Sequence, residues 1–200
     1  MVRSNPHRLF LYKKCCVGWK MKILMLIDSL GIGGAETHVE ALSLELTRHG
    51  HEVKIATSGG EIAQRLQKQG VEILPLPDFS TKNGRRGDTK FAFNMPFCIK
   101  IAEFLILQRK IREYVDGELP DVVHAHTRRT ALGAKSVCKR RKIPLVTTAH
   151  ALFLMKFPQN WLSCWGDRTI AVSCDIKNHL VRHDVPENQI EIVENGVQIP

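Results

Sequence analysis

The sequence predicts an α/β fold in which helices cover both faces of a doubly wound parallel sheet. The first observation is that short apolar runs alternate with segments of helical period from Met21 onward. The second is that most of these runs are continuous rather than alternating, as in strands buried on both faces. The third is size, because 200 residues, 44% of them hydrophobic, are enough to fill the core of one such domain.

Seven strands are expected, each a short run of apolar and β-branched residues. They span residues 22–28, 52–58, 71–76, 121–125, 145–149, 168–173 and 190–194. Five helices lie between them, over residues 34–48, 60–69, 94–116, 129–141 and 174–183. Gly50 and Gly70 each follow a helix and precede a strand, as C-terminal caps do. Ser173 or Asp175 can cap the last helix, and Pro144 stops the one before it.

Two stretches fall outside this pattern. Residues 1–20 hold five basic side chains and no acidic one, and thus supply +5 of the formal net charge of +9. Their apolar run LFLY is shorter than the core of an export signal, so we expect a poorly ordered basic extension before a domain at residues 21–200. Residues 78–93 form one long irregular loop, and loops of that length in a compact domain are usually functional or mobile.

Charge, cysteine content and hydropathy exclude several classes of protein. Residues 21–200 carry only the remaining +4, too small an excess to indicate nucleic-acid binding. The six cysteines form no metal-binding spacing, and the chain is large enough to fold without disulfides, so reduced thiols in the cytoplasm are expected. No apolar run approaches the roughly 18 residues of a membrane-spanning helix. Peripheral contact of the loop 78–93 and the following helix with the inner face of the membrane stays open, because both mix basic and apolar residues.

Glycines follow the first predicted strand, at the edge where doubly wound sheets bind ligands. Gly31, Gly33 and Gly34 precede a helix, and such a loop lets a phosphate approach backbone N–H groups at the helix start. The loop fits neither nucleotide signature, because Glu36 stands where GxGxxG has its third glycine and no Gly-Lys-Ser/Thr follows. From composition alone, phosphate contact and an ordinary tight turn are equally good interpretations.

Histidines end the fourth and fifth predicted strands. His124 and His126 point to the same side while their strand lasts, so one is expected to be buried while the other reaches the ligand edge. A structural histidine is the commoner case for each one, but His126 and His150 at two strand ends are harder to assign to chance. No metal is expected, because Asp28 and Glu36 are the only further ligands near this edge. The imidazoles suit hydrogen bonding, or weak base chemistry, toward a hydroxyl substrate.

Three longer segments carry a family resemblance. They are MKILMLIDSLGIGGAETHVEALSLELTRHGHEV, DVVHAHTRRTALGAKSVCKRRKIPLVTTAH and TIAVSCDIKNHLVRHDVPENQIEIVENGV. Together they resemble the N-terminal domain of retaining GT-B glycosyltransferases of family 4. The resemblance implies a Rossmann-like, acceptor-side half that faces a second, donor-binding domain across a cleft. It also implies transfer of a hexose from a UDP- or GDP-linked donor to a lipid-linked or polysaccharide acceptor, without a cofactor.

The resemblance assigns roles to residues of the first and fourth strand ends. Gly33 and Gly34 would lie near the diphosphate of the donor. His126 would be the catalytic histidine near the transferring sugar. We add Arg128, which follows the same strand end as His126, and Glu36, which follows the glycines, as residues expected to bind the acceptor.

Three further residues take roles at the cleft and at the exit from the domain. His150 would lie on the acceptor side of the cleft. Asn195 and Gly196 would make the turn that leads toward the second domain.

The sequence departs from the family pattern in one respect. The two donor-site glutamates of such enzymes, eight positions apart, have no counterpart, and NGVQIP stands where the second domain should start. A fragment, split gene product or excised domain is therefore expected, inactive alone and open to a partner chain that supplies the second domain. Two other interpretations remain, a half-domain of a sugar-nucleotide epimerase and a non-catalytic binding module or truncated remnant.

Overall fold

The computed structural model describes residues 19–78, 97–152 and 164–196, with side chains from residue 101 onward in the second of these ranges. Nearly all of the predicted extension 1–20 and of the predicted loop 78–93 lies outside the described residues. The described strands form one parallel sheet of seven strands in the order β3-β2-β1-β4-β5-β6-β7, which confirms the predicted α/β class.

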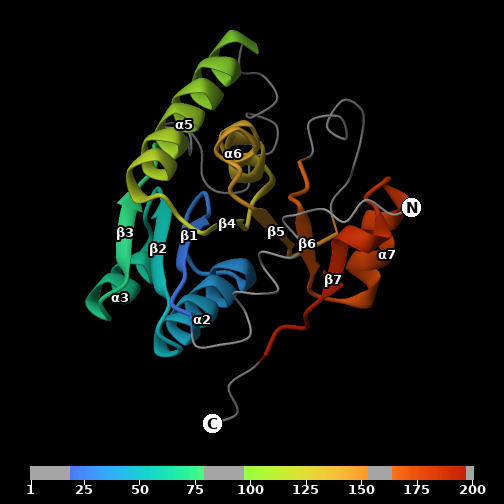
Figure 1. Cartoon of the computed structure of the whole chain (residues 1–200), viewed down its shortest axis with the longest axis horizontal. Helices are drawn as coiled ribbons and strands as arrows, with labels where there is room; N and C mark the ends of the chain where they lie inside the picture. Colours follow the sequence, from blue (N-terminus) through green and yellow to red (C-terminus); the bar gives the residue numbers. More distant parts are fainter. Residues whose placement is uncertain (1–18, 79–96, 153–163, 197–200) are drawn as a thin grey trace.

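All seven predicted strands and all five predicted helices are present (Figure 1). The strands are β1 (Lys22–Leu26), β2 (Glu52–Thr57), β3 (Glu72–Pro75), β4 (Val122–Ala125), β5 (Leu145–Ala149), β6 (Arg168–Ala171) and β7 (Ile190–Ile192). The helices are α2 (Gly34–Arg48), α3 (Glu61–Lys68), α5 (Phe97–Glu118), α6 (Arg128–Arg141) and α7 (Cys174–Arg182), with a short 3-10 turn η1 (Glu187–Gln189). Several strands end one to two residues earlier than predicted, so the residues at their carboxyl ends belong to loops.

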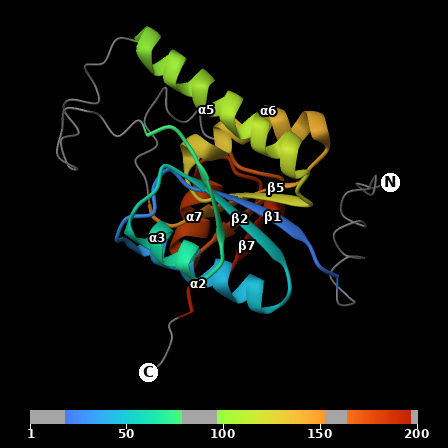
Figure 2. The same cartoon turned by 90° about the vertical axis from the view of Figure 1, so that its left-hand side faces the viewer.

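Helices α5 and α6 cover one face of the sheet, and α2 and α3 cover the other (Figures 1 and 2). Leu107 and Ile111 of α5 pack with Val137 of α6 over β1, β4 and β5. On the other face, Val39 of α2 and Leu66 of α3 pack over β1 and β2. Burial of these continuous apolar strands on both faces contributes most to the stability of the fold.

Helices α5 and α6 run side by side in the same direction. The ion pair between Arg129 and Glu103 joins their amino-terminal ends at 3.6 Å, and the pair between Arg141 and Asp116 joins their carboxyl ends at 2.7 Å. Close approach is possible because α6 carries Gly133, where a Cβ atom would come within 3.0 Å of a methyl group of Ile111. The amino-terminal end of α5 therefore lies at the carboxyl edge of the sheet.

Helix termini follow the predicted capping. The Ser173 hydroxyl accepts a hydrogen bond from the Ile176 amide at 3.3 Å, so Ser173 rather than Asp175 caps α7. Gly50 and Gly70 both have positive φ, at 84° and 85°, as expected after a helix. Helix α6 ends at Arg141, and Lys142 (φ 56°) adopts the left-handed conformation two residues before Pro144.

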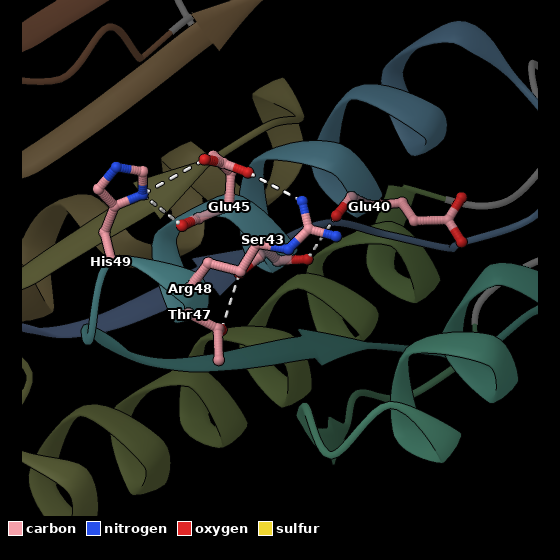
Figure 3. Close-up of polar contacts among 6 residues, drawn as sticks. All are labelled: Glu40, Ser43, Glu45, Thr47, Arg48 and His49. Carbon is pink, nitrogen blue, oxygen red and sulfur yellow. Dashed lines mark hydrogen bonds and ion pairs between the residues drawn. The ribbon is translucent and has the colours of Figure 1, made fainter. Parts of the chain in front are cut away.

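The carboxyl end of α2 is closed by its own side chains (Figure 3). Glu45 accepts from Arg48 Nη1 at 3.2 Å, and its backbone oxygen lies 2.9 Å from His49 Nδ1. The Thr47 hydroxyl donates to the Ser43 oxygen at 2.8 Å. Arg48 at this end complements the helix dipole. The opposite, amino-terminal end of α2 lies at the carboxyl edge of the sheet because α2 follows β1.

The strand order places the switch point of the sheet between β1 and β4. From there the chain winds outward through β2 and β3 on one side and through β5, β6 and β7 on the other. The loops after β1 and β4 therefore diverge, and ligands of doubly wound sheets bind in the crevice between such loops.

Candidate functional site

The glycine loop after β1 is held in place by the loop after β2. Leu30 donates to the Gly59 oxygen at 2.8 Å, and its own oxygen accepts from the Ile62 amide at 3.0 Å. Gly60 has φ +136°, and a Cβ atom there would collide with the backbone oxygen of Leu30. Packing between the two loops therefore requires glycine at position 60.

The turn does not require glycine at the two positions predicted to lie near a diphosphate. Gly33 is in extended backbone conformation (φ 178°), which any residue adopts. A Cβ atom at Gly34 would meet no atom within 4 Å, and one at Gly33 would meet only the flexible carboxylate of Glu36. At these two positions the backbone conformation does not require glycine, and the bare backbone leaves open surface at the exposed start of α2.

Four histidines gather beside this loop, from α2, β4 and the end of β5. The His126 ring centroid lies 4.1 Å from that of His124, 5.5 Å from that of His150 and 6.0 Å from that of His38. His38 and His150 are 5.0 Å apart. The Asn195 side chain hydrogen-bonds His38, so the segment after β7 also reaches this cluster.

His124 and His126 point to the same side, as expected, but both are buried, with exposed fractions of 7% and 4%. This corrects the expectation that only one of them would be buried. The reason is that strand pairing continues past β4, because the His126 amide donates to the Leu26 oxygen at 2.9 Å. His126 nevertheless lines the pocket at this edge.

Burial keeps these imidazoles neutral near pH 7. Burial first, and neighbouring imidazoles second, lower the pKa of His124 to about 3 and that of His150 to about 4. The pKa of His126 is also lowered well below its usual value, first by burial and then by the other histidines. These side chains act here through hydrogen bonds rather than through positive charge.

The hydrogen bonds of the cluster leave one buried atom unsatisfied. His124 Nε2 lies 2.7 Å from the Thr148 hydroxyl, and His126 Nδ1 lies 3.2 Å from His150 Nε2. Among the described residues, His126 Nε2 is the buried side-chain nitrogen or oxygen without a hydrogen-bond partner. An unpaired buried polar atom is unfavourable, so this nitrogen calls for an explanation such as an ordered water or a ligand.

A pocket of about 370 Å³ lies between the loop after β1, the start of α6 and the end of β5. Its polar lining consists of Asp28, His126, Thr127, Arg128, Arg129, Thr147, Thr148 and His150. Trp165 and Cys164 close another side. Burial raises the pKa of the Cys164 thiol, which therefore stays protonated and is a poor nucleophile.

The predicted site residues are distributed unevenly around this pocket. His126, His150 and Arg128 all line it, and burial lowers the pKa of Arg128. Glu36 does not line it, because its carboxylate turns back toward Gly33. Gly196 is exposed beyond β7, next to Asn195.

Three residues of the site received no role from the sequence. His38 lies on the inward face of α2, one position before the buried Val39, so the helical period could have revealed it. Asp28 was visible as a polar residue at a strand end. Trp165 carries no local signal, because only the tertiary fold brings it to the pocket.

The described residues form neither a metal-binding cluster nor a membrane-spanning helix. In the part of the chain that the structure describes, no three His, Cys, Asp or Glu side chains are placed to hold a metal ion. Over residues 19–78, 97–152 and 164–196, no helix is long and apolar enough to cross a membrane.

The sheet order and the pocket at its switch point define a Rossmann-like α/β domain with a ligand site at the carboxyl edge. Residues 32–199 match the sequence profile of Glycosyltransferase Family 4, so the chain belongs to this family. No curated protein sequence matches the chain.

Solved structures share the fold at low sequence identity. The glycosyltransferase from Rickettsia africae ESF-5 is 19% identical, with a TM-score of 0.67 over 89% of this chain and 44% of that one. HepE from Anabaena, in complex with UDP-glucose, is 16% identical, with a TM-score of 0.62 over 88% of this chain and 44% of HepE. The lipopolysaccharide outer core galactosyltransferase WaaB is 15% identical, with a TM-score of 0.62 over 90% of this chain and 47% of WaaB. The chain thus spans less than half the length of these structures and has the fold of a GT-B half.

Proposed function

We propose that this chain is the acceptor-side half of a retaining hexosyltransferase. The complete enzyme would move a hexose from a UDP- or GDP-linked donor to a lipid-linked or polysaccharide acceptor. The observation that carries the proposal is the juxtaposition, at the switch point, of the open start of α2 and a pocket lined by neutral histidines. The UDP-glucose complex of HepE, a structure of similar fold, supports a nucleotide sugar as the donor.

Gly33 and Gly34 would receive the diphosphate of the donor. The start of α2 carries the positive end of the helix dipole, and a Cβ at Gly34 would meet only open space. Electrostatic stabilisation of the leaving diphosphate usually contributes more to such a transfer than any other single effect. A second domain would supply the other diphosphate contacts when it closes over this edge.

His126 would contact the transferring sugar. Its ring lines the pocket, and a neutral imidazole would bond a sugar hydroxyl without adding charge to the site. His150, bonded to His126 Nδ1, would fix the tautomer and the ring orientation. The mechanism proposed here needs no metal and no cofactor.

Exposed apolar residues support the position of a second domain. Ile32 follows β1 and is 77% exposed, and Leu152 follows β5 and is 61% exposed. Ile192 and Val193 at the end of β7 are also exposed. A second domain that closes over the carboxyl edge would cover these apolar side chains. Asn195 and Gly196 would lead the chain, or dock a partner chain, across that edge.

A peripheral membrane role is proposed for α5. Ile101, Leu105 and Ile106 are exposed large apolar residues at the end of α5 nearest the pocket, and Arg109 follows one turn later. Such a mixture favours contact with an anionic lipid surface on the cytoplasmic side. Sedimentation with anionic vesicles should remove the wild-type chain from the supernatant but leave the Leu105→Glu variant there. Equal removal of both proteins would contradict this role.

An epimerase half-domain is the second candidate. UDP-GlcNAc 2-epimerase from Rickettsia bellii shares the fold with a TM-score of 0.55 at 16% identity. Among the described residues that line the pocket, only Asp28 supplies a carboxylate, whereas acid-base chemistry on a sugar ring usually uses paired groups. The family match favours the transferase.

Calorimetric titration with UDP- and GDP-sugars tests the proposal. The chain is titrated alone and together with a C-terminal donor-binding domain of a family member added in trans. Binding that appears only with the added domain, together with release of the sugar, is the expected result. Absence of binding in both titrations would favour a non-catalytic remnant, and interconversion of the donor sugar would favour an epimerase.

A further inference from the structure

Asp28 stands out in the pocket because of its charge. It lies two residues after the buried end of β1 at Leu26, and it is the only carboxylate among the described residues that line the pocket. Glu36, the carboxylate predicted to bind the acceptor, does not reach the lining. A ligand hydroxyl that enters this pocket and needs an anionic acceptor would therefore meet Asp28.

The surroundings of Asp28 leave hydrogen-bonding capacity for a ligand. The Thr127 side chain is hydrogen-bonded to Asp28, and its hydroxyl also accepts from the Thr130 amide at 3.4 Å and lies 2.8 Å from the Thr130 hydroxyl. Arg129 is the nearby positive charge, and it also pairs with Glu103 at 3.6 Å. A carboxylate has about four lone-pair sites, so one bond from Thr127 leaves most of them for other donors.

Burial makes those remaining sites energetically important. Burial raises the pKa of the Asp28 carboxyl, and this effect exceeds the lowering by Arg129 and Thr127. Arg129 and Thr127 therefore offset only part of the free-energy cost of burying the charged carboxylate. A ligand that donates hydrogen bonds to the carboxylate would complete the compensation.

The remaining lining matches a sugar ring. Arg128 and neutral His150 offer donors, Thr148 offers a hydroxyl, and Trp165 offers aromatic surface for the C–H face of a sugar. The volume of about 370 Å³ lies at the lower end of the range for small-molecule sites. A mixed set of donors, one strong acceptor and an aromatic wall suits vicinal hydroxyls better than a purely anionic group.

We infer that Asp28 binds a hydroxyl of the acceptor sugar, with Thr127 and Arg129 holding its carboxylate toward the pocket. The inference rests on the proposed function, and it names a sugar ring as the part of the acceptor that enters this half. It replaces Glu36 by Asp28 as the acceptor-binding carboxylate.

The test uses the whole chain and four probes, glucose, galactose, mannose and N-acetylglucosamine. Each is titrated to about 100 mM while amide NMR signals are recorded, because single sugars typically bind isolated sites in the millimolar range. At least one sugar should shift the signals of Thr127, Arg128 and His150. The Asp28→Asn variant should weaken that sugar at least tenfold, and Asp28→Glu should recover part of the loss.

Asp121→Asn is the matched control. Asp121 lies away from both pocket loops, at the opposite, amino-terminal edge of β1 and β4, where its carboxylate accepts from the Lys22 amide at 2.9 Å. This variant should lose stability without a change in sugar affinity.

Three results would overturn the inference. One is equal affinity in wild type and Asp28→Asn. Another is an equal loss in Asp28→Asn and Asp28→Glu that accompanies a lower unfolding temperature, since that pattern shows a structural role for the carboxylate. The third is the absence of shifts with all four sugars. None of these results bears on donor binding with the added C-terminal domain, so the proposed function stands or fails separately.

Discussion

The loops after β1 and β2 lie side by side and are both rich in glycine, but glycine has a different role in each. In the loop after β2, Gly59 and Gly60 have φ of +104° and +136°, which side chains rarely adopt. In the loop after β1, Gly33 is extended and neither it nor Gly34 lies in the left-handed region, and Gly34 faces open space. The backbone thus needs glycine at positions 59 and 60, whereas backbone and packing do not require it at positions 33 and 34.

Glycines in two neighbouring loops therefore differ in whether the backbone requires them. A glycine that the backbone requires can be recognised from its conformation and from the atoms that a Cβ would meet. A glycine that neither conformation nor packing requires needs another explanation, and for the start of α2 we propose the approach of an anion to backbone N–H groups. Substitutions in and around the two loops test this separation.

The largest expected effect is that of Gly60→Ala. The new Cβ would collide with the Leu30 oxygen and would force a strained φ, so the free energy of unfolding should fall by about 3–5 kcal/mol. Urea unfolding measures this loss. Gly59→Ala is the matched control, because it imposes the strain without the collision and should cost only about 1–2 kcal/mol. Equal losses for both variants would show that the contact with Leu30 is unimportant.

The next effect concerns the histidines beside the β1 loop. The folded pKa of His124, about 3, lies below the unfolded value near 6.5, so the unfolded chain binds more protons between these values. The contribution of the neutral His124 ring to the free energy of unfolding is therefore fully present above about pH 6.5 and is lost as the pH falls toward 3. From pH 7 to pH 5, His124 alone should cost about 2 kcal/mol.

Urea unfolding at the two pH values tests this, with His124→Gln as the comparison variant. The variant should show a shallower pH dependence than the wild type, because it removes one group that titrates only after unfolding. The same slope in both proteins would mean that His124 is charged in the folded chain.

The third effect has the opposite sign to the first. Gly34→Ala places a methyl group in open space at the start of a helix, so it should raise the free energy of unfolding by about 0.5–1 kcal/mol. Thermal unfolding would detect this. A loss of stability would show that the fold does need glycine there, and the contrast between the two loops would disappear.

The smallest effect is expected at Gly133, the glycine between α5 and α6. Gain of helix propensity, about 1 kcal/mol, should roughly offset the crowding of the Ile111 methyl group in Gly133→Ala. A net change within about 1 kcal/mol in urea unfolding is expected. A loss as large as that of Gly60→Ala would show that the helix contact is as rigid as the contact between the loops.

The fold could be predicted well because its signals are local. Continuous apolar runs, Gly50 and Gly70 after helices, and Ser173 before α7 each depend on nearby residues, and all are confirmed. Strand ends were less accurate, because pairing at the edge depends on the neighbouring strand. The end of β1 shows this, since the predicted strand runs to Asp28 but the observed one ends at Leu26.

The site could be predicted only in part, because it is assembled from distant segments. Strand ends identified His126, His150 and Arg128, since parallel strands bring their carboxyl ends to one edge. Glu36 does not line the pocket, and the turn of its side chain back to Gly33 cannot be read from helical spacing, so its acceptor role stays a prediction. Trp165 was missed for a similar reason, as its contact with the pocket exists only in the folded chain.

The central claim is that the bare start of α2 exists for the donor diphosphate. The most direct measurement is calorimetric titration of UDP- or GDP-sugar into the chain combined with a C-terminal donor-binding domain, for the wild type and for Gly34→Ala. We predict that the variant, although no less stable, binds the donor at least tenfold more weakly, about 1.4 kcal/mol. Equal affinity in the two proteins would contradict the claim and leave the glycines without a role in donor binding.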